Sequence, residues 1–256
     1  MSLLSAHALA TGYPERVLVR ELELRIEPGQ TWAVLGNNGS GKSTLLLTLA
    51  GLRPALRGEI QLSGRVLSAF AARARARHLG LLLQEDPCAF WGSVREYVLL
   101  GRYPHRRSLW GWSDGDFAQA DAAIAQVDLD GRAQRPLNAL SGGERQRARL
   151  AMMLAQSPHV LLLDEPLQHL DLRHQRDVLA LLGKWADSSA RAVCMSLHDP
   201  WAARRFCTHA VMLFDDGRWR AGPVEALLDD ASLERLYGFP LSGWLGAAQG
   251  APGRHV

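Results

Sequence analysis

The chain has 256 residues, 47% of them hydrophobic, and a net charge of only +3. Such a length can bury one large core or two closely joined ones, and the small charge gives no support for nucleic-acid binding. Cys88, Cys194 and Cys207 lie far apart without C-x-x-C spacing, so we expect a reducing compartment and no structural zinc. No apolar stretch approaches the ~20 residues that span a bilayer, and the N-terminus lacks a signal-peptide pattern. Any work at a membrane is therefore expected to depend on separate membrane subunits.

The first elements of the chain read as two half-exposed strands. Residues 2–11 and 17–26 alternate apolar and polar side chains, with Leu22, Leu24 and Ile26 on one side of the second segment. This alternation is typical of antiparallel strands that keep one face in water. The apolar run at residues 31–35 then predicts a strand that leads directly into a glycine-rich loop.

This loop matches the pattern G-x-x-x-x-G-K-[ST] at every fixed position. Its residues are Gly36, Asn37, Asn38, Gly39, Ser40, Gly41, Lys42, Ser43 and Thr44. The glycines let the backbone turn tightly enough to aim successive N–H groups at a phosphate. Lys42 is expected to reach the β- and γ-phosphates, Ser43 to offer its hydroxyl to Mg²⁺, and the following helix to add its positive N-terminal end. The chain is therefore predicted to bind a nucleoside triphosphate.

Further strands and helices follow the loop. A short strand at residues 59–62 and an alanine- and arginine-rich helix at 70–78 come first, and apolar runs at 160–163 and 192–197 predict buried parallel strands. Beyond Tyr237 the chain is rich in glycine and alanine, so we expect a frayed tail there.

Between these strands lies a segment of a different character. From about residue 87 to 155 the pattern is helical, at 93–100, at 116–127 and in a longer helix that includes 148–155, with no convincing strand. The segment is therefore expected to be a helical insert in an otherwise α/β domain.

A second phosphate-binding arrangement opens the last of these helices. Residues 140–147 read LSGGERQR, so the hydroxyl of Ser141 and the side-chain-free Gly142 and Gly143 stand at a helix N-terminus. One nucleotide rarely needs two such sites from one chain, and the economical interpretation is that this one serves the nucleotide of a neighbouring copy. The alternative, an ordinary helix cap, explains Ser141 but not the glycine pair and the basic turn after it.

Together the glycine-rich loop and this string resemble the ATP-binding-cassette (ABC) ATPases, and the other family motifs follow in the expected order. Residues 160–166 resemble the Walker B motif, Gln84 the Q-loop glutamine, and His198 the switch histidine. A lone histidine after a strand is more often structural, but its place in this ordered set favours a catalytic role. The resemblance covers about residues 3–238.

The resemblance implies both architecture and organisation. The fold would be α/β, a P-loop NTPase ABC cassette with a RecA-like core, an antiparallel β subdomain and an inserted helical subdomain at about residues 87–155. Residues 1–238 would form the cassette, and residues 239–256 a flexible C-terminal tail.

Roles for single residues follow from the same resemblance. Catalysis would rest on Glu165, which polarises the attacking water, together with His198, Lys42 and Gln84. Asp164 and Ser43 would support Mg²⁺, and Gln84 would sense both the metal ion and the γ-phosphate. The bound molecules would be ATP and Mg²⁺, with two copies of the chain sandwiching two ATP molecules.

The D-loop and the residue that stacks on adenine are two further candidate contacts. The usual D-loop sequence, Ser-Ala-Leu-Asp, is replaced by Gln168-His169-Leu170-Asp171, so Asp171 stays a candidate for contacts across the dimer. His169 either makes those contacts pH-sensitive or is a neutral hydrogen-bonding residue. Tyr13 is the candidate for stacking on adenine, with a plain surface tyrosine as the alternative.

The insert resembles one group within the family. Residues 94–105 are similar to the ATPases of importers for iron-siderophores, haem and cobalamin, and such importers pair two cassettes with two membrane subunits and a periplasmic or extracellular binding protein. Residues 85–103 would meet the membrane subunits. Trp91, Tyr97 and Tyr103 are candidate aromatic anchors, and core packing is the alternative for Tyr97 above all. A loop with Trp110 and Trp112 either meets a partner or folds back onto the insert.

We therefore expect the ATP-hydrolysing subunit of an ABC importer for a metal chelate, held at the cytoplasmic face of the inner membrane by its membrane subunits. The alternative is a soluble ABC ATPase without a transport role, such as one for iron–sulfur cluster assembly. An exporter half without its membrane domain is a third option.

Overall fold

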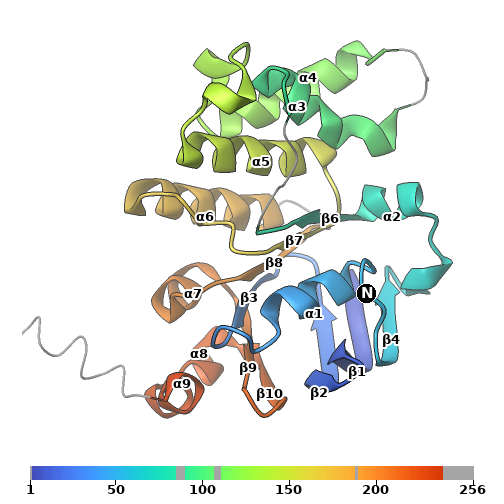
Figure 1. Cartoon of the computed structure of the whole chain (residues 1–256), viewed down its shortest axis with the longest axis vertical. Coiled ribbons are helices and arrows are strands. Elements are labelled where there is room, and N and C mark those ends of the chain that lie inside the picture. Colours follow the sequence, from blue (N-terminus) through green and yellow to red (C-terminus); the bar gives the residue numbers. More distant parts are fainter. Residues whose placement is uncertain (1, 85–89, 107–110, 188–189, 239–256) are drawn as a thin grey trace, which may run out of the picture.

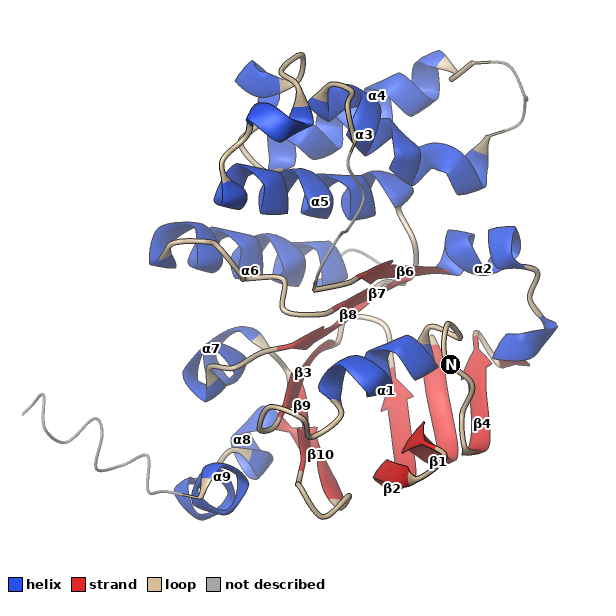
Figure 2. Cartoon of the chain, viewed as in Figure 1, coloured by secondary structure: helices blue, strands red, loops and turns tan. Residues whose placement is uncertain are grey.

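Two β-sheets and a layer of helices make up the protein (Figures 1 and 2). The structure, a computed structural model, describes residues 2–84, 90–106, 111–187 and 190–238. The smaller sheet has the strand order β2-β1-β4-β5 and is antiparallel. Its strands are β1 (Leu4–Tyr13), β2 (Arg16–Ile26), β4 (Arg57–Leu62) and β5 (Arg65–Val66). In β2, Leu22, Leu24 and Ile26 are buried and the residues between them are exposed, which confirms the half-exposed strand predicted from alternation.

The larger sheet has six strands in the order β10-β9-β3-β8-β7-β6. They are β3 (Thr31–Leu35), β6 (Leu79–Leu82), β7 (Val160–Leu163), β8 (Ala192–Ser196), β9 (His209–Leu213) and β10 (Trp219–Pro223). All neighbours are parallel except β9 and β10. The carboxyl ends of β3, β6, β7 and β8 therefore meet at one edge, where an open parallel sheet binds its ligands.

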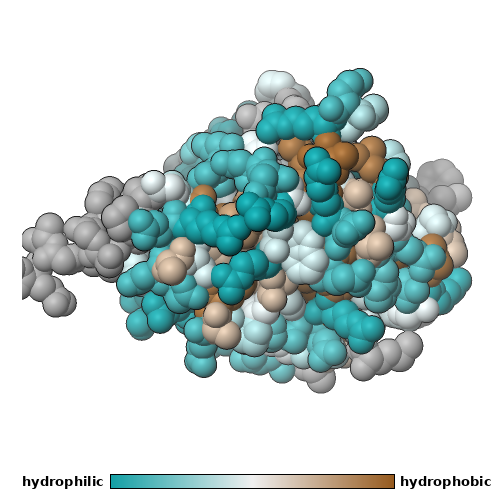
Figure 3. Space-filling model, turned by 90° about the horizontal axis from the view of Figure 1, so that it is seen from below, coloured by the Kyte–Doolittle hydropathy of each residue, from teal (hydrophilic) through white to brown (hydrophobic). Residues whose placement is uncertain are grey.

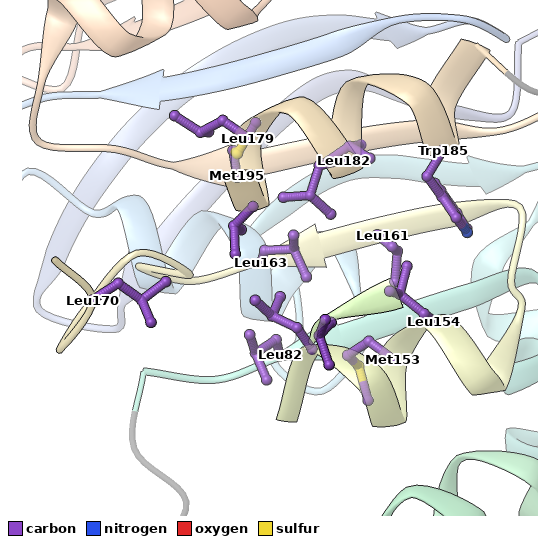
Figure 4. Close-up of a cluster of buried hydrophobic side chains, with 14 of the residues drawn as sticks. Leu82, Met153, Leu154, Leu161, Leu163, Leu170, Leu179, Leu182, Trp185 and Met195 are labelled. Carbon is purple, nitrogen blue, oxygen red and sulfur yellow. The ribbon is translucent and has the colours of Figure 1, made fainter. Parts of the chain in front are cut away.

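Both faces of this sheet are covered, which explains its continuous apolar runs. Alternate residues belong to two different buried clusters: Leu161 and Leu163 face one, and Leu162 and Cys194 face the other. In the first cluster, side chains of α5 and α6 meet those of β6, β7 and β8 (Figure 4). In the second, α1 and the antiparallel sheet pack on the opposite face.

The helices outside the insert surround the larger sheet (Figure 1). They are α1 (Lys42–Leu49), α2 (Ala72–His78), α6 (Leu172–Asp187), α7 (Pro200–Phe206), α8 (Val224–Leu227) and α9 (Asp230–Tyr237), with a 3₁₀ turn at Leu67–Ala69. The strands and helices predicted from the sequence are found: those at 31–35 and 160–163 match to the residue, and the others have shifted ends. Helices α6 to α9 and strands β5, β6, β9 and β10 were not predicted.

The insert is helical, as its pattern predicts. It contains α3 (Val94–Leu99), α4 (Asp114–Gln126), α5 (Gly142–Gln156) and 3₁₀ turns at Leu100–His105, Asp130–Arg132 and Leu137–Ala139. Ser93, Ser113 and Ser141 each begin an α-helix with a reciprocal capping box. Helix α5 starts at Gly142 and includes the predicted 148–155, and Ser141 caps it at the helix N-terminus predicted from the sequence.

The α/β fold class is thus confirmed, with an antiparallel sheet and an inserted helical region. The predicted tail at 239–256 lies outside the described residues, and the division of the chain at residue 238 stays a prediction. Within the described ranges, no helix has the length and apolar character needed to cross a membrane. The face seen from below is mainly hydrophilic, with its apolar side chains in small groups (Figure 3).

Candidate functional site

The glycine-rich loop connects the end of β3 to α1 at the carboxyl edge of the larger sheet. Gly41, the residue before α1, has φ +105°, a conformation that residues with a Cβ rarely adopt. At Gly36 a Cβ would lie 2.5 Å from Ser40 Oγ and 2.7 Å from the carbonyl oxygen of Leu213. The glycines at these two positions therefore meet a backbone requirement of this turn.

Lys42 is held inside the loop. Its Nζ donates to the carbonyl oxygens of Gly36 at 2.8 Å and Asn37 at 3.0 Å, and its side chain is buried. Burial lowers the pKa of Lys42, and the nearby carboxylates of Glu165, Asp164 and Asp215 oppose that shift. A phosphate bound in the loop would add negative charge beside this amine and so favour its charged form.

The loop is also tied to the C-terminal helix. The side-chain amide of Asn37 donates to Asp215 Oδ2 and to the carbonyl oxygen of Leu236, each at 3.1 Å. These contacts join residues far apart in the sequence, so the pattern of the loop alone could not indicate them. Asn37 therefore fixes the loop against α9 rather than lining the cavity beside it.

The Walker B carboxylates follow β7 and are fixed by the neighbouring strand. Ser196 Oγ, at the end of β8, donates to Asp164 Oδ1 at 2.6 Å and accepts from the backbone N–H of Glu165 at 2.7 Å. Sequence reasoning missed Ser196. Its position at the carboxyl end of a parallel strand, two residues before His198, was the available signal.

Glu165 is the centre of the predicted catalytic group. His198 Nε2 lies 2.8 Å from its Oε1, and Gln84 Nε2 donates to its Oε2 at 3.0 Å. Its backbone has φ +48°, an uncommon conformation for a residue other than glycine. The structure thus brings the ends of β6, β7 and β8 together around one carboxylate. The carboxylate is thereby held in a fixed orientation, and its role in accepting a proton from water stays a prediction.

A cavity of about 560 Å³ lies beside this carboxylate. Tyr13, Asn38, Gly39, Gly41, Lys42, Ser43, Thr44, Gln84, Glu165 and His198 line it, and Arg16 and Leu18 complete the lining. Ten predicted residues therefore share one cavity, whereas Ser40 is buried within the loop. Arg16 and Leu18 were missed, because nothing in their strand pattern distinguishes them from their neighbours.

Tyr13 lies at the rim of this cavity and is half exposed. The guanidinium carbon of Arg53 lies 4.0 Å from the centre of its ring, and Arg53 Nε donates to the carbonyl oxygen of Gly12 at 3.1 Å. A cation over one face of an aromatic ring stabilises its orientation. Tyr13 is consequently more than a loose surface side chain, and its role in stacking on adenine stays a prediction.

Ser141, Gly142 and Gly143 are not among the residues that line the cavity. Ser141 Oγ accepts from the N–H of Glu144 at 3.2 Å, and Glu144 Oε2 accepts from the N–H of Ser141 at 2.9 Å, so Ser141 does cap the helix. A Cβ on Gly143 would lie 3.1 Å from the carbonyl oxygen of His169. The glycines thus permit close packing against the D-loop, and their role toward a neighbouring copy stays a prediction.

The D-loop residues have local contacts. His169 is exposed with φ +64°, and Asp171 Oδ1 accepts from the N–H of His174 at 2.9 Å and lies 2.8 Å from its Nδ1. These hydrogen bonds hold the pKa of Asp171 below its usual value. Asp171 thus acts at the first turn of α6, and the predicted contacts across a dimer are untested.

The oxygen ligands present fit a magnesium ion that arrives with a nucleotide. The hydroxyl of Ser43, the carboxylate of Asp164 and the amide of Gln84 are hard donors of the kind Mg²⁺ prefers. Within the described ranges, no group of three or more His, Cys, Asp or Glu side chains could hold a metal ion. Mg²⁺ usually binds through one or two carboxylates and the phosphates of its substrate, and a role of these three residues toward it stays a prediction.

The aromatic residues of the insert divide into two kinds. Trp91 and Tyr103 are 82% and 62% exposed, whereas Tyr97 is only 3% exposed and belongs to the core. Tyr97 is therefore not a surface anchor, because its ring packs against Phe90 inside the insert. Trp112 packs onto the core with Arg106 over its ring at 4.8 Å, while Trp110 and residues 85–89 lie outside the described ranges.

Comparison with known proteins agrees with this geometry. The family model described as ABC transporter matches residues 19–168. The chain is 36% identical to an achromobactin transport ATP-binding protein of Dickeya dadantii, covering 93% of this chain and 88% of that one. It is 40% identical to a hemin import ATP-binding protein of Pseudomonas entomophila, covering 86% and 87%. A metal-chelate type ABC transporter solved in an inward-facing conformation aligns with TM-score 0.82 and 29% identity over 94% of this chain and 90% of that one. The chain belongs to the ATP-binding proteins of ABC transporters, the ATPases that energise transport.

Proposed function

We propose that this chain energises the uptake of an iron chelate, a ferric siderophore or haem, by hydrolysing ATP. The observation that carries the proposal is similarity over nearly the whole chain to ATP-binding proteins whose names state achromobactin transport and hemin import. Cobalamin, which the insert resemblance also suggested, appears in neither name, so the proposal is restricted to iron chelates. The iron–sulfur assembly and exporter alternatives have no comparable support.

The catalytic step follows from the contacts around Glu165. ATP would lie in the cavity with its phosphates on the N–H groups of the loop and on Lys42, and Mg²⁺ would add positive charge there. Glu165 would accept the proton of the attacking water, oriented by Gln84 and His198 on its two oxygens. Catalysis would thus combine positioning with electrostatic stabilisation, without a covalent intermediate.

The second half of each site would come from a second copy of the chain. Ser141, Gly142 and Gly143 form a helix N-terminus that the chain does not bring to its own cavity, as a sandwich of two ATP molecules between two copies requires. Hydrolysis would then depend on closure of the dimer. Because ATP would favour the closed state, its binding and hydrolysis can drive a change in the membrane subunits.

Those membrane subunits would hold the protein at the cytoplasmic face of the membrane. The exposed ring of Trp91, within the proposed contact segment 85–103, is the kind of large aromatic side chain that anchors interfaces. Two membrane subunits and a periplasmic or extracellular binding protein would complete the importer.

The test is uptake in cells that lack the chain. Deleting its coding sequence should abolish accumulation of radiolabelled iron supplied as a ferric siderophore or as haem, and the intact chain should restore it. The variant Glu165→Gln should bind the membrane subunits and fail to restore uptake. Normal uptake of both iron chelates by the deletion strain would contradict the proposal.

A further inference from the structure

Two buried arginines of α5 have contrasting partners. Arg147 and Arg149 are 8% and 9% exposed and lie two residues apart, so they project from opposite sides of the helix. Arg147 donates to the carbonyl oxygens of Val127 at 2.8 Å and Asp128 at 3.1 Å, directly after α4. Arg149 instead reaches the strand that leads to Gln84. One arginine therefore joins two helices of the insert, and the other joins the insert to the catalytic edge of the sheet.

The contacts of Arg149 are made where the sheet ends. The hydrogen bond from the N–H of Asp164 to the carbonyl oxygen of Leu82 closes the pairing between β6 and β7. The next two carbonyl oxygens, those of Leu83 and Gln84, accept from the guanidinium of Arg149, the second at 3.2 Å. Arg149 thus holds the main chain of the residue whose side-chain amide lies 3.0 Å from Glu165 Oε2.

A second side chain of α5 extends this arrangement to the other side of Glu165. Gln146 is buried one turn before Arg149, and its Oε1 accepts from Arg149 at 2.9 Å. Its Nε2 donates to the carbonyl oxygen of Pro166 at 2.9 Å. Arg149 and Gln146 therefore form hydrogen bonds with the main chain on both sides of the Gln84–Glu165 contact, at residues 83–84 and at Pro166.

We propose that Arg149 is a positioning residue that fastens Gln84 to the signature helix, so that a displacement of α5 is passed to the Gln84–Glu165 contact. The proposal rests on the function proposed above for Glu165. An apolar side chain would fill this space without partners, whereas a buried guanidinium is costly unless it is well hydrogen-bonded. Its two terminal nitrogens donate to two successive carbonyl oxygens and a side-chain amide, while its buried Nε has no hydrogen-bond partner among the described residues. Arg149 is not among the residues that line the cavity, so we expect it to act through Gln84.

The test compares Arg149→Met with Arg147→Met in the full chain. Both changes remove a buried arginine of α5 that donates to two carbonyl oxygens, so both should lower the melting temperature by a similar amount. Arg149→Met should lower kcat for ATP hydrolysis about tenfold or more and change KM less than twofold, because the loop that binds ATP is untouched. Arg147→Met, whose contacts run only to the end of α4, should lower kcat clearly less than Arg149→Met does. Equal losses of kcat in the two variants would overturn the proposal.

A double-mutant comparison shows whether Arg149 acts through Gln84. If it does, Gln84→Ala with Arg149→Met should be no slower than Gln84→Ala alone. Multiplication of the two single effects would mean that Arg149 acts by another route, and the proposal would be wrong. If Arg149→Met does not fold, the variant Arg149→Lys is used in its place. Lysine keeps one donor nitrogen, so kcat should fall several-fold at constant KM. A kcat equal to that of the original chain would overturn the proposal.

Failure of this inference can be told apart from failure of the proposed function. If Glu165→Gln keeps normal turnover, the catalytic assignment itself is wrong, whatever Arg149 does. If Glu165→Gln stops turnover while Arg149→Met leaves kcat unchanged, only the positioning role of Arg149 fails.

Discussion

The two edges of the molecule that carry the predicted ATP-binding residues are built in different ways. At the carboxyl edge of the larger sheet, Gln84 and His198 contact Glu165, and Ser196 fixes Asp164. At the N-terminus of α5, the hydrogen bonds of Ser141 run to Glu144, three residues along the same helix. One edge is therefore assembled by the tertiary fold, and the other by a local helix cap.

This difference predicts how each edge depends on a second copy of the chain. The sheet edge gathers residues from several strands, so it can bind ATP in a single chain. The helix edge presents N–H groups and a hydroxyl that do not line this cavity, so its contribution to ATP binding is predicted to need a nucleotide held by another copy. Substitutions at the sheet edge that weaken ATP binding should consequently do so already in the monomer, and those at the helix edge should act only in the dimer.

The largest expected effect is that of Lys42→Ala, at the sheet edge. In this structure, the amine of Lys42 donates to two carbonyl oxygens of the loop, and with ATP bound it would contact the phosphates. A hydrogen bond to a charged group contributes about 1.5–3 kcal/mol, so ATP affinity should fall about tenfold to a hundredfold, and turnover should stop. Calorimetric titration with ATP and a phosphate-release assay measure both effects. Unchanged affinity in a folded variant would refute the assignment of the loop.

Glu165→Gln should separate binding from turnover at the same edge. The amide keeps the shape of the side chain and cannot accept a proton, so kcat should fall roughly 10²- to 10⁴-fold while ATP affinity is retained. The trapped nucleotide should also hold two copies together. Gel filtration with ATP should show a dimer, and a species that stays monomeric and still hydrolyses ATP would remove Glu165 from this role.

The sequence predicted the sheet edge better than the contacts that hold it. The strand at 160–163 was predicted to the residue, because its apolar run lies between turn signals, and the motif residues after the strands could be identified by type. The contact of Asn37 with Leu236, and that of Ser196 with Asp164, join distant residues, and no local pattern encodes such pairs. The expected roles of these residues therefore came from the family resemblance, and the distances between them came from the structure.

The helix edge was predicted less well, because local patterns compete there. Ser141 reads both as a cap and as a phosphate ligand, and the structure shows the cap. The glycine pair has low helix propensity, yet it forms the first turn of α5 at the helix N-terminus predicted from the sequence. Helix α6 was missed altogether, although its apolar residues recur with helical spacing at Val178, Leu179 and Leu182.

Two substitutions at Ser141 separate the cap from the phosphate ligand. Aspartate and asparagine cap helices about as well as serine, so both variants should keep the melting temperature. Ser141→Asp places a negative charge where the γ-phosphate of ATP bound to the other copy would lie, so its kcat should fall about a hundredfold. The kcat of Ser141→Asn, which adds no charge, should fall much less. If both variants hydrolyse ATP at the original rate, the hydroxyl is only a cap.

Mixing two inactive variants tests whether the site is shared. A dimer of one Ser141→Asp subunit and one Lys42→Ala subunit retains one site in which both halves are intact. The mixture should therefore regain part of the turnover that each pure variant lacks. A mixture as inactive as its components would remove the main support for a site built from two copies.

The smallest effect concerns the surface proposed to meet the membrane subunits, where Trp91 and Tyr97 form a matched pair. Trp91 is 82% exposed and Tyr97 is 3% exposed, although both belong to the same predicted contact segment. Loss of an aromatic anchor costs about 2 kcal/mol of interface energy, so Trp91→Ala should weaken binding to the membrane subunits about thirtyfold and leave the melting temperature unchanged. Tyr97→Ala should lower the melting temperature, because it opens a cavity in the core of the insert, and should leave binding of the folded protein to the membrane subunits unchanged. Copurification with the membrane subunits and thermal melting measure the two effects. If Trp91→Ala copurifies as well as the unaltered chain, the contact surface lies elsewhere on the insert.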